Sequence, residues 1–455
     1  MTVPQAIATV VIVNYNGAHL LPACLDALDA QRSEAAPFET VVVDNNSSDD
    51  SRDLLAAKYP WVRVIESASN LGFAGGNNLA AREVMTPFTV MLNNDAMPQA
   101  RWLERLLAPF SEPGADRLAA VNGKTYFHPR FLRVDLTTTA YRPGPHDGRD
   151  LGVKVSSVTV DDTDVTRDVR WESAAYGPET VGQRTIRWTR PTGEILVPVP
   201  DDAVAGTTTN RPVRVELSVS AERTKPLTAN GLRATVGTEQ TTVAVELPCR
   251  TTVERVINNV GSIVLHDGHG ADRGFEERDT GQFDEPVEIF AACGNGMAIR
   301  TEVGSELGWF DDDYFMYYED IDLSWRIRSR GYSIRYEPTA ELRHLHSASS
   351  DSWSPNWTFH VDRNRLLTLT KDASTPVACS AVLRYPLVSL SMLARSVFEA
   401  LRTRSRPAAG RHVVRAKVLR SYFRLLPRMI RRRRNIAKAA TVTRAQLETW
   451  LTVRA

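Results

Sequence analysis

The chain of 455 residues is poor in cysteine, and its four cysteines form no CxxC pair: Cys24, Cys249, Cys293 and Cys379. This spacing argues against a zinc cluster and a disulfide framework, and it is typical of a protein in a reducing compartment. The sequence also lacks an uninterrupted run of about 18 apolar residues, which predicts that no helix spans a membrane. No basic segment or small-residue cleavage site flanks the first apolar stretch, so we expect no signal peptide.

Neither sign of charge is in excess, because the formal net charge is +1 at pH 7. Such a balance gives no indication of nucleic-acid binding. Two common phosphate-binding motifs are missing as well. No P-loop occurs, and the first apolar run leads into "NYNG" instead of the GxGxxG of dinucleotide-binding proteins.

What the sequence does contain is a regular alternation of strand and helix patterns over its first 110 residues. Short runs rich in β-branched residues predict buried strands at residues 7–13, 40–44, 62–67 and 87–92. Apolar residues at helical spacing lie between them. Repeated βα units predict an α/β fold with a mainly parallel sheet, in which ligands bind at the carboxyl ends of the strands.

Polar side chains stand at the carboxyl end of each of these four runs. Single endings of this kind are ordinary turn chemistry, but four in succession predict a binding crevice. Asp44 could accept the ring N–H of uracil or thymine, and Gly72 would let the backbone approach a ligand closely. Asp95 could ligate a hard cation such as Mg²⁺ or Mn²⁺ that carries phosphates. The residues concerned are Asn14, Asn16, Asp44, Asn45, Asn70, Gly72, Asn93, Asn94 and Asp95.

Two later segments also carry candidate chemistry. In "YYEDIDLSW", Glu319 and Asp320 precede a predicted helix. Acids there are stabilised by the helix dipole, or one of them acts as a general base toward a hydroxyl. In "RHLHS", His344 and His346 would face the same side of a strand. They are either ordinary polar residues at a strand end, or His344 completes a metal shell as neutral imidazole.

The remaining segments differ in character. Residues 133–255 alternate Val, Thr and Arg between frequent turn residues, which predicts an inserted β-sandwich. Its Trp171 and Trp188 are either sugar platforms or core residues. Residues 371–455 predict Arg-rich helices, whose basic peak is "RMIRRRRNIAK". These helices either lie on an anionic membrane face or form a packed helical cap with a solvated basic side.

Taken in order, several motifs resemble the family 2 glycosyltransferases with the GT-A fold, especially bacterial rhamnosyltransferase-like members. They are "VVIVNYNG", "VVVDNNSSDDS", "NLGFAGGNN", "VMLNNDA" and the segment from "GWFDDDYFMYYEDIDLSWR" to "RHLHSAS". The resemblance implies a GT-A donor-binding half at residues 1–132 and an acceptor and catalytic half at 256–370. The inserted module at 133–255 and the helical region at 371–455 lie outside the shared pattern.

The resemblance also implies roles for the candidate residues. Asp320 would be the catalytic base with Glu319 as its neighbour, and Asp95 and His344 would hold Mg²⁺ or Mn²⁺. The donor would be bound by Asn14, Asn16, Asp44, Asn45, Asn70, Gly72, Asn93 and Asn94. Many family members have an acid where Asn93 stands, so we expect modest metal affinity.

The function that the resemblance implies is inverting, metal-dependent transfer of a sugar from dTDP-rhamnose or a UDP-sugar. The acceptor would be a hydroxyl of a cell-envelope glycan or a lipid-linked molecule, and the enzyme would be cytoplasmic or peripheral on the inner face of the membrane. The QxxRW motif of processive synthases is missing, which predicts one sugar per encounter. Two alternatives stay open: a non-catalytic carbohydrate-binding protein, and a sugar nucleotidyltransferase. The latter would need a Gly- and Lys-rich loop near the N-terminus, where Lys58 is the only lysine before Lys124.

Overall fold

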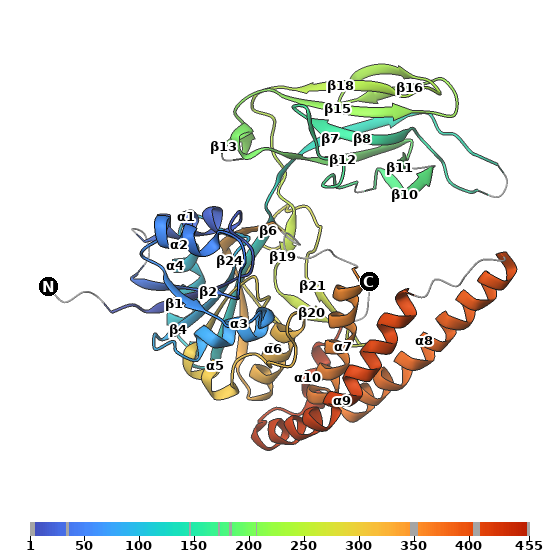
Figure 1. The fold of residues 1–455 in the computed structure, drawn as a ribbon. Coiled ribbons are helices and arrows are strands. Elements are labelled where there is room, and N and C mark those ends of the chain that lie inside the picture. The colour runs from blue at the N-terminus through green and yellow to red at the C-terminus, as the bar shows by residue number, and fades with distance from the viewer. Residues whose placement is uncertain are drawn as a thin grey trace. The chain divides into compact units, whose positions relative to one another are not determined.

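A computed structural model describes residues 5–32, 36–144, 147–171, 173–181, 184–205, 207–345, 354–403 and 410–452. Two compact units are present (Figure 1). The first combines Met1–His128 with Ile257–Ala455, and the second is Pro129–Val256. The predicted fold class is confirmed, because a mixed sheet flanked by helices is accompanied by an inserted all-β module and C-terminal helices.

The sheet of the first unit has ten strands in the order β22-β24-β6-β23-β4-β1-β2-β3, with β19 beside β6 and β5 beside β24. Four of them are the strands that the sequence predicts, and each ends within one residue of the predicted position. They pair in parallel and span Ala8–Asn14 (β1), Phe38–Asp44 (β2), Arg63–Glu66 (β3) and Phe88–Asn93 (β4).

The second half of this sheet contains strands from distant parts of the chain. β23 (Gly296–Arg300) runs antiparallel between β4 and β6 (Leu118–Phe127), and β24 (Ser333–His344) runs parallel to β6. β24 also pairs with β5 (Ala96–Pro98), which sets His344 opposite Ala96. The other strands are β19 (Ile257–Asn259), the hairpin β20 (Ser262–Val264) and β21 (Gly270–Asp272), and β22 (Val287–Glu288).

Both faces of the sheet are covered, as its continuous apolar strands require. Val10 and Ile12 of β1 belong to one core cluster, which includes residues of α1 and α4. Val11, between them, faces the other side and belongs to a cluster with residues of α3 and α6. The helices are α1 (Leu21–Gln31), α2 (Ser51–Lys58), α3 (Gly72–Ala81), α4 (Trp102–Leu107), α5 (Thr301–Leu307) and α6 (Glu319–Ser329).

The second unit consists of two main antiparallel sheets around one core cluster. Its two ends leave side by side, because the backbones of Phe131 and Glu254 exchange hydrogen bonds of 3.0 and 2.7 Å. Trp188 is buried and Trp171 packs against the core, so both serve packing. The strands are β7 (Arg130–Thr138), β8 (Lys154–Val160), β9 (Thr163–Asp164), β10 (Ala175–Val181), β11 (Arg184–Thr189), β12 (Thr192–Val199), β13 (Val204–Ala205), β14 (Thr208–Thr209), β15 (Val213–Ser220), β16 (Lys225–Ala229), β17 (Leu232–Val236) and β18 (Thr241–Leu247).

The C-terminal helices are α7 (Pro355–Asp372), α8 (Thr375–Thr403), α9 (Gly410–Ala439) and α10 (Arg444–Leu447). Leu366 of α7 and Tyr422 of α9 share a core cluster with Trp325 of α6. This packing makes α7 and α9 part of the first unit, as the predicted helical cap would be.

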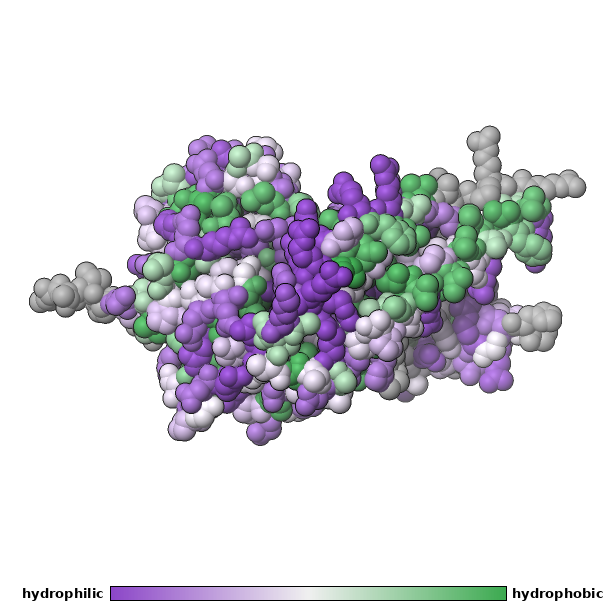
Figure 2. All heavy atoms as spheres, turned by 90° about the horizontal axis from the view of Figure 1, so that it is seen from below, coloured by the Kyte–Doolittle hydropathy of each residue, from purple (hydrophilic) through white to green (hydrophobic). Residues whose placement is uncertain are grey.

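α8 is different, because its outer side carries exposed apolar residues, with Leu387 66% and Leu401 75% exposed. Apolar side chains are visible along the C-terminal helices in Figure 2. By length and composition, α8 meets the criterion for a membrane span, and among the described residues it is alone in this. The sequence analysis did not identify this stretch as a candidate span, because Arg384 and Arg395 interrupt the apolar run. Core helices of soluble proteins can meet the same criterion, but little of α8 is buried.

Candidate active site

The carboxyl ends of the parallel strands meet at one edge of the sheet. Asn14 lies opposite Asp44 in the β1–β2 register, and Asn93 lies opposite Val13 in the β1–β4 register. Asn94 donates to Asn14 Oδ1 over 2.8 Å, which joins the end of β4 to the end of β1. The structure therefore brings the predicted donor-binding residues of these strands together.

Asp44 is fully buried at this edge. Its Oδ2 accepts from Arg52 Nε at 2.7 Å, whereas its Oδ1 has no hydrogen-bond partner among the described residues. A buried carboxylate oxygen without a donor is costly, which marks Oδ1 as an atom prepared for a ligand N–H.

Several predicted donor-binding side chains instead bind the protein itself. Asn14 donates to Ser51 at 2.9 Å and is wholly buried. Asn45 donates to Asn70 at 3.1 Å, and its own Oδ1 accepts from Leu71 N at 2.9 Å. The side chains of Asn14 and Asn45 thus hold the crevice loops in shape. The oxygen of Asn16 is likewise engaged, because it accepts from Ser48 N at 2.7 Å.

Gly72 makes a close contact within the protein. Its φ is +70°, and a Cβ there would lie 2.3 Å from the carbonyl oxygen of Phe315. Ala74 N donates to this same carbonyl over 3.0 Å. The missing side chain at Gly72 lets α3 approach the loop before α6 closely.

His344 and Asp95 form the centre of the second part of the site. Nε2 of His344 lies 3.0 Å from Oδ1 of Asp95 and 3.2 Å from Nδ2 of Asn93. On its other side, Nδ1 of His344 lies 3.1 Å from Oδ1 of Asn258. If Nδ1 carries the proton that Asn258 accepts, the Nε2 lone pair faces the buried carboxylate of Asp95. Two acceptors at this distance need a proton or a cation between them.

The acids at the start of α6 form the third part. Asp320 Oδ2 accepts from Gly294 N at 3.0 Å and Oδ1 accepts from Ile321 N at 2.7 Å. Burial raises the pKa of Asp320, although these N–H groups counteract the effect. Burial and the charge of Asp320 raise the pKa of Glu319 well above its ordinary value. Oε2 of Glu319 is buried and has no hydrogen-bond partner among the described residues.

Asp322 belongs to a structural ion network and not to this site. Arg326 lies 2.8 Å from it and Lys371 of α7 lies 2.5 Å from it. Burial alone would raise the pKa of Asp322, but these two cations hold it well below its ordinary range. The network fastens α6 to α7.

The backbone before the acids is in an unusual conformation. Phe315, Tyr317 and Tyr318 have φ of 65°, 67° and 71°, in the left-handed region. Asn364 of α7 donates to the carbonyls of Tyr314, Met316 and Tyr317 over 3.0, 2.8 and 2.7 Å. Strained backbone held by such a clamp is characteristic of functional loops.

Asp272, which the sequence analysis did not identify, lies between the second and third parts. Burial, the largest cause, and the charge of Asp320 together raise its pKa to about 6, although the hydrogen bond from Asn259 and the influence of His344 counteract them. Both groups are therefore within electrostatic range of Asp272, which places Asp320 and His344 in one neighbourhood. A lone Asp in a turn-rich segment belongs to no motif, so sequence reasoning had no signal for it. The same holds for Asn258 and Asn364.

No group of three or more His, Cys, Asp or Glu side chains suited to a metal occurs within the described ranges. His346, the second histidine of "RHLHS", lies outside those ranges. A cation at Asp95 and His344 would therefore take its further ligands from bound phosphates or water.

Comparisons with known proteins agree with this architecture. Residues 9–152 match the family model of Glycosyl transferase family 2. The chain is 26% identical over 119 residues to glycosyltransferase AglE of Haloferax volcanii, a match that covers 26% of this chain and 39% of that protein. It is 39% identical over 62 residues to N-acetylglucosaminyl-diphospho-decaprenol L-rhamnosyltransferase of Mycobacterium tuberculosis, which covers 14% of this chain and 20% of that protein. The chain thus spans well under two thirds of these relatives.

Among solved structures, GalNAc-T7 with UDP, GalNAc and Mn²⁺ aligns with a TM-score of 0.44 at 13% identity, covering 80% of this chain and 48% of that one. The family match rests on the sequence and the fold assignment on the sheet described above. Residues 9–152 therefore match glycosyl transferase family 2, and they contain the parallel strands of a mixed sheet that is flanked by helices.

Proposed function

We propose that this protein transfers one sugar, with inversion, from a nucleoside-diphosphate donor to a hydroxyl group of a cell-envelope glycan or lipid-linked acceptor. The observation that carries the proposal is the contact of 3.0 Å between Asp95 and His344 at the end of β4. This contact lies in the electrostatic neighbourhood of Asp272 and Asp320. In this proposal Asp95 and His344 form the diphosphate site and Asp320 is the base beside it, an arrangement that sugar transfer requires.

The donor would enter along the carboxyl edge of β1, β2 and β4. Oδ1 of Asp44, buried and without a partner in the described chain, would accept the ring N–H of uracil or thymine. This pairing suits dTDP-rhamnose and UDP-sugars alike. Asn70 and Asn94 would hold the loops beside the donor, and Asn93 would lie next to its diphosphate.

A divalent cation, Mg²⁺ or Mn²⁺, would be held by Asp95 and His344. Ligand atoms at adjacent corners of an octahedron with bonds of about 2.1 Å lie about 3.0 Å apart. The two side-chain atoms stand 3.0 Å apart, so their separation fits such a cation. Oδ1 of Asn93 is buried nearby without a partner among the described residues, which adds an oxygen to the same region. When bound, the cation would neutralise the charge of the departing diphosphate.

Asp320 would remove the proton from the attacking hydroxyl of the acceptor. Its raised pKa makes it a stronger base than an exposed aspartate, and two backbone N–H groups fix its orientation. Burial and the charge of Asp320 raise the pKa of Glu319 well above its ordinary value, so Glu319 holds its proton more tightly than an exposed glutamate. When Glu319 is protonated, Asp320 has no negative charge beside it and is the acid that accepts the proton of the hydroxyl.

The names of two relatives and the exposed side of α8 support the acceptor and the location that we propose. One relative is named for a diphospho-decaprenol acceptor, and another, 25% identical over 137 residues, is a teichoic acid poly(glycerol phosphate) polymerase. A lipid-linked acceptor at the inner face of the cell membrane fits these names and the exposed apolar side of α8.

The decisive experiment is a donor assay on the full chain. Hydrolysis of dTDP-rhamnose and a panel of UDP-sugars should be measured without acceptor, with Mn²⁺ and with EDTA. We expect slow hydrolysis of one donor that depends on Mn²⁺. Donor binding without any hydrolysis would favour the non-catalytic carbohydrate-binding alternative. Formation of a sugar nucleotide from sugar phosphate and nucleoside triphosphate would favour a nucleotidyltransferase.

A further inference from the structure

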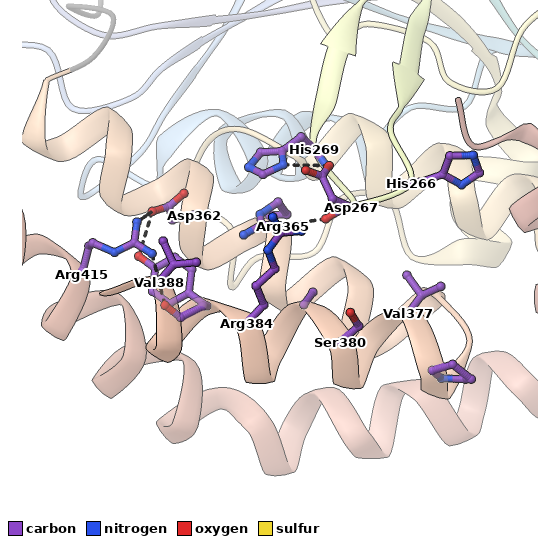
Figure 3. A pocket seen from close by; sticks show the side chains of 13 residues that line it. His266, Asp267, His269, Asp362, Arg365, Val377, Ser380, Arg384, Val388 and Arg415 are labelled. Atoms are coloured by element: carbon purple, nitrogen blue, oxygen red, sulfur yellow. Dashed lines mark hydrogen bonds and ion pairs between the residues drawn. The ribbon is translucent and has the colours of Figure 1, made fainter. Parts of the chain in front are cut away.

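A cavity of about 500 Å³ lies between the β20–β21 turn and helices α7, α8 and α9, apart from the donor crevice (Figure 3). Arginine side chains enter it from three helices: Arg365 of α7, Arg384 of α8 and Arg415 of α9. His266 and His269 line it from the turn. Arginines from three helices and two histidines from the turn converge on one space, which is the composition of a phosphate-binding pocket.

The two carboxylates in the pocket already have partners within the protein. Asp267 lies 2.9 Å from Nδ1 of His269. Asp362 accepts from the hydroxyl of Tyr385 at 2.8 Å, and Arg415 lies 3.5 Å from it. The two acids offset two of the three arginine charges, so the pocket keeps a formal charge of +1 even with both histidines neutral.

The guanidinium groups of Arg365 and Arg384 can still donate hydrogen bonds to a ligand. Arg365 is 7% exposed, and although its Nη1 donates to Asp267 O at 2.9 Å, its Nε is buried without a hydrogen-bond partner among the described residues. Arg384 is exposed and extends from α8 toward Arg365. A buried guanidinium N–H without an acceptor is costly, so Arg365 in particular calls for an anionic ligand.

The position of the pocket relates it to the reaction. Its turn residue His269 is three residues before Asp272, a span of about 10 Å along a strand. Tyr318, which precedes Glu319, donates its hydroxyl to Gly268 O at 3.2 Å and accepts from Gly270 N at 2.8 Å. The turn that lines the pocket is thus fastened to the loop that carries the proposed base.

An apolar stripe begins beside the pocket. Leu383, Leu387 and Leu390 of α8 are exposed and follow the i, i+4, i+7 spacing of one helix face, which Phe398 and Leu401 extend. From Leu383 to Leu401 the stripe is about 27 Å long. Arg384, at the pocket, is adjacent to Leu387 on the helix surface.

From these observations we propose that the pocket binds the phosphate or diphosphate of a lipid-linked acceptor, whose apolar chain lies along the exposed face of α8. This inference rests on the proposed function, because it assigns the acceptor of that reaction. The phosphate would pair with Arg365 and Arg384, and the glycan would extend past the β20–β21 turn toward Asp320.

The test uses geranyl diphosphate as the probe and isothermal titration calorimetry of the full chain. UDP and Mn²⁺ are present in excess, so that the donor crevice is filled. We expect Arg384→Ala to weaken binding about tenfold or more, because a charge-assisted phosphate contact is lost. Arg384→Glu should weaken it further. The matched control is Arg395→Ala, an exposed arginine of the same helix that does not line the pocket, and it should bind like the wild type.

Two further ligands identify the source of the phosphate. Inorganic pyrophosphate and geraniol should each bind at least about tenfold more weakly than geranyl diphosphate, because one lacks the apolar chain and the other the charge. Equal affinity for pyrophosphate would overturn the assignment to a lipid-linked group. Unchanged affinity in both Arg384 variants would overturn the pocket itself. Binding of UDP with Mn²⁺ is titrated separately, so its failure would count against the proposed function alone.

Discussion

Nε2 of His344 lies 3.0 Å from Oδ1 of Asp95, because the β24–β5 pairing sets the end of a late strand beside the residue that follows β4. Asn258 contacts the other ring nitrogen of His344 at 3.1 Å. The orientation of the imidazole thus depends on a residue that belongs to no motif.

Asn258→Ala should therefore lower the affinity for Mn²⁺ about 10–100-fold, as loss of a group that orients a metal-binding histidine does. The measurement is a Mn²⁺ titration of the thermal unfolding midpoint in the presence of a nucleoside diphosphate. Asn356→Ala, at an exposed position of α7, is the control and should leave the affinity unchanged. Equal Mn²⁺ affinity in the two variants would show that His344 does not hold the metal.

Asp320→Asn should lower the turnover of sugar transfer about 10²–10⁴-fold, because the amide cannot accept the hydroxyl proton. Donor affinity should stay close to that of the wild type, since Asp320 lies outside the donor crevice. Steady-state kinetics and donor titration separate the two effects. Asp116→Asn, at an exposed position, controls for the change of charge. Turnover like that of the wild type in Asp320→Asn would remove Asp320 from the mechanism.

Asp272 should make stability depend on pH. Its folded pKa of about 6 is raised above the ordinary value, so the folded state binds its proton more tightly than the unfolded state does. This contribution is present below about pH 4 and is lost as the pH rises through about 6. Relative to Asp272→Asn, the wild type should lose at most about 3 kcal/mol of unfolding free energy over this range.

The pH dependence is measured by urea denaturation between pH 4 and 7, with EDTA present so that no cation compensates the carboxylate. A constant difference between wild type and Asp272→Asn across this range would contradict the assigned pKa.

Gly72→Ala should be more harmful than Gly114→Ala, although both glycines have positive φ, +70° and +84°. At Gly114 nothing lies within 4 Å of an added Cβ, so the cost is the left-handed backbone alone, about 1–2 kcal/mol. At Gly72 the added carbon meets the carbonyl of Phe315 at 2.3 Å, which brings the cost to about 2–5 kcal/mol. Thermal or urea unfolding of both variants measures the difference. Equal destabilisation of the two variants would mean that the loop before α6 shifts easily to make room for the added carbon.

The strands that end at Asn14, Asp44 and Asn93 could be located from the sequence, because β-branched runs stop at polar residues. The orientation of single side chains could not be predicted in this way. The sequence suggested ligand contacts for Asn14 and Asn45, and in the structure the amide of Asn14 donates to Ser51 of α2 while the amide of Asn45 accepts from Leu71 N. Whether an amide faces a ligand or the protein depends on partners far along the chain, which spacing does not reveal.

Asp272 and the pocket at Arg365 illustrate the same limit. Neither lies in a motif, since each acquires its chemistry from elements that meet only in the folded chain. The sequence analysis did not identify α8 as a candidate membrane span, for another reason. A rule that requires an uninterrupted apolar run excludes a helix that has arginines along one side, even when its other side is apolar.

The backbone pairing of Phe131 with Glu254 closes the second unit at its base. Chain ends that leave a module as neighbouring antiparallel strands are only about 5 Å apart. A tight turn could replace the whole module without stretching the chain on either side. A single insertion or deletion in the gene could therefore add or remove the module and leave the surrounding fold intact.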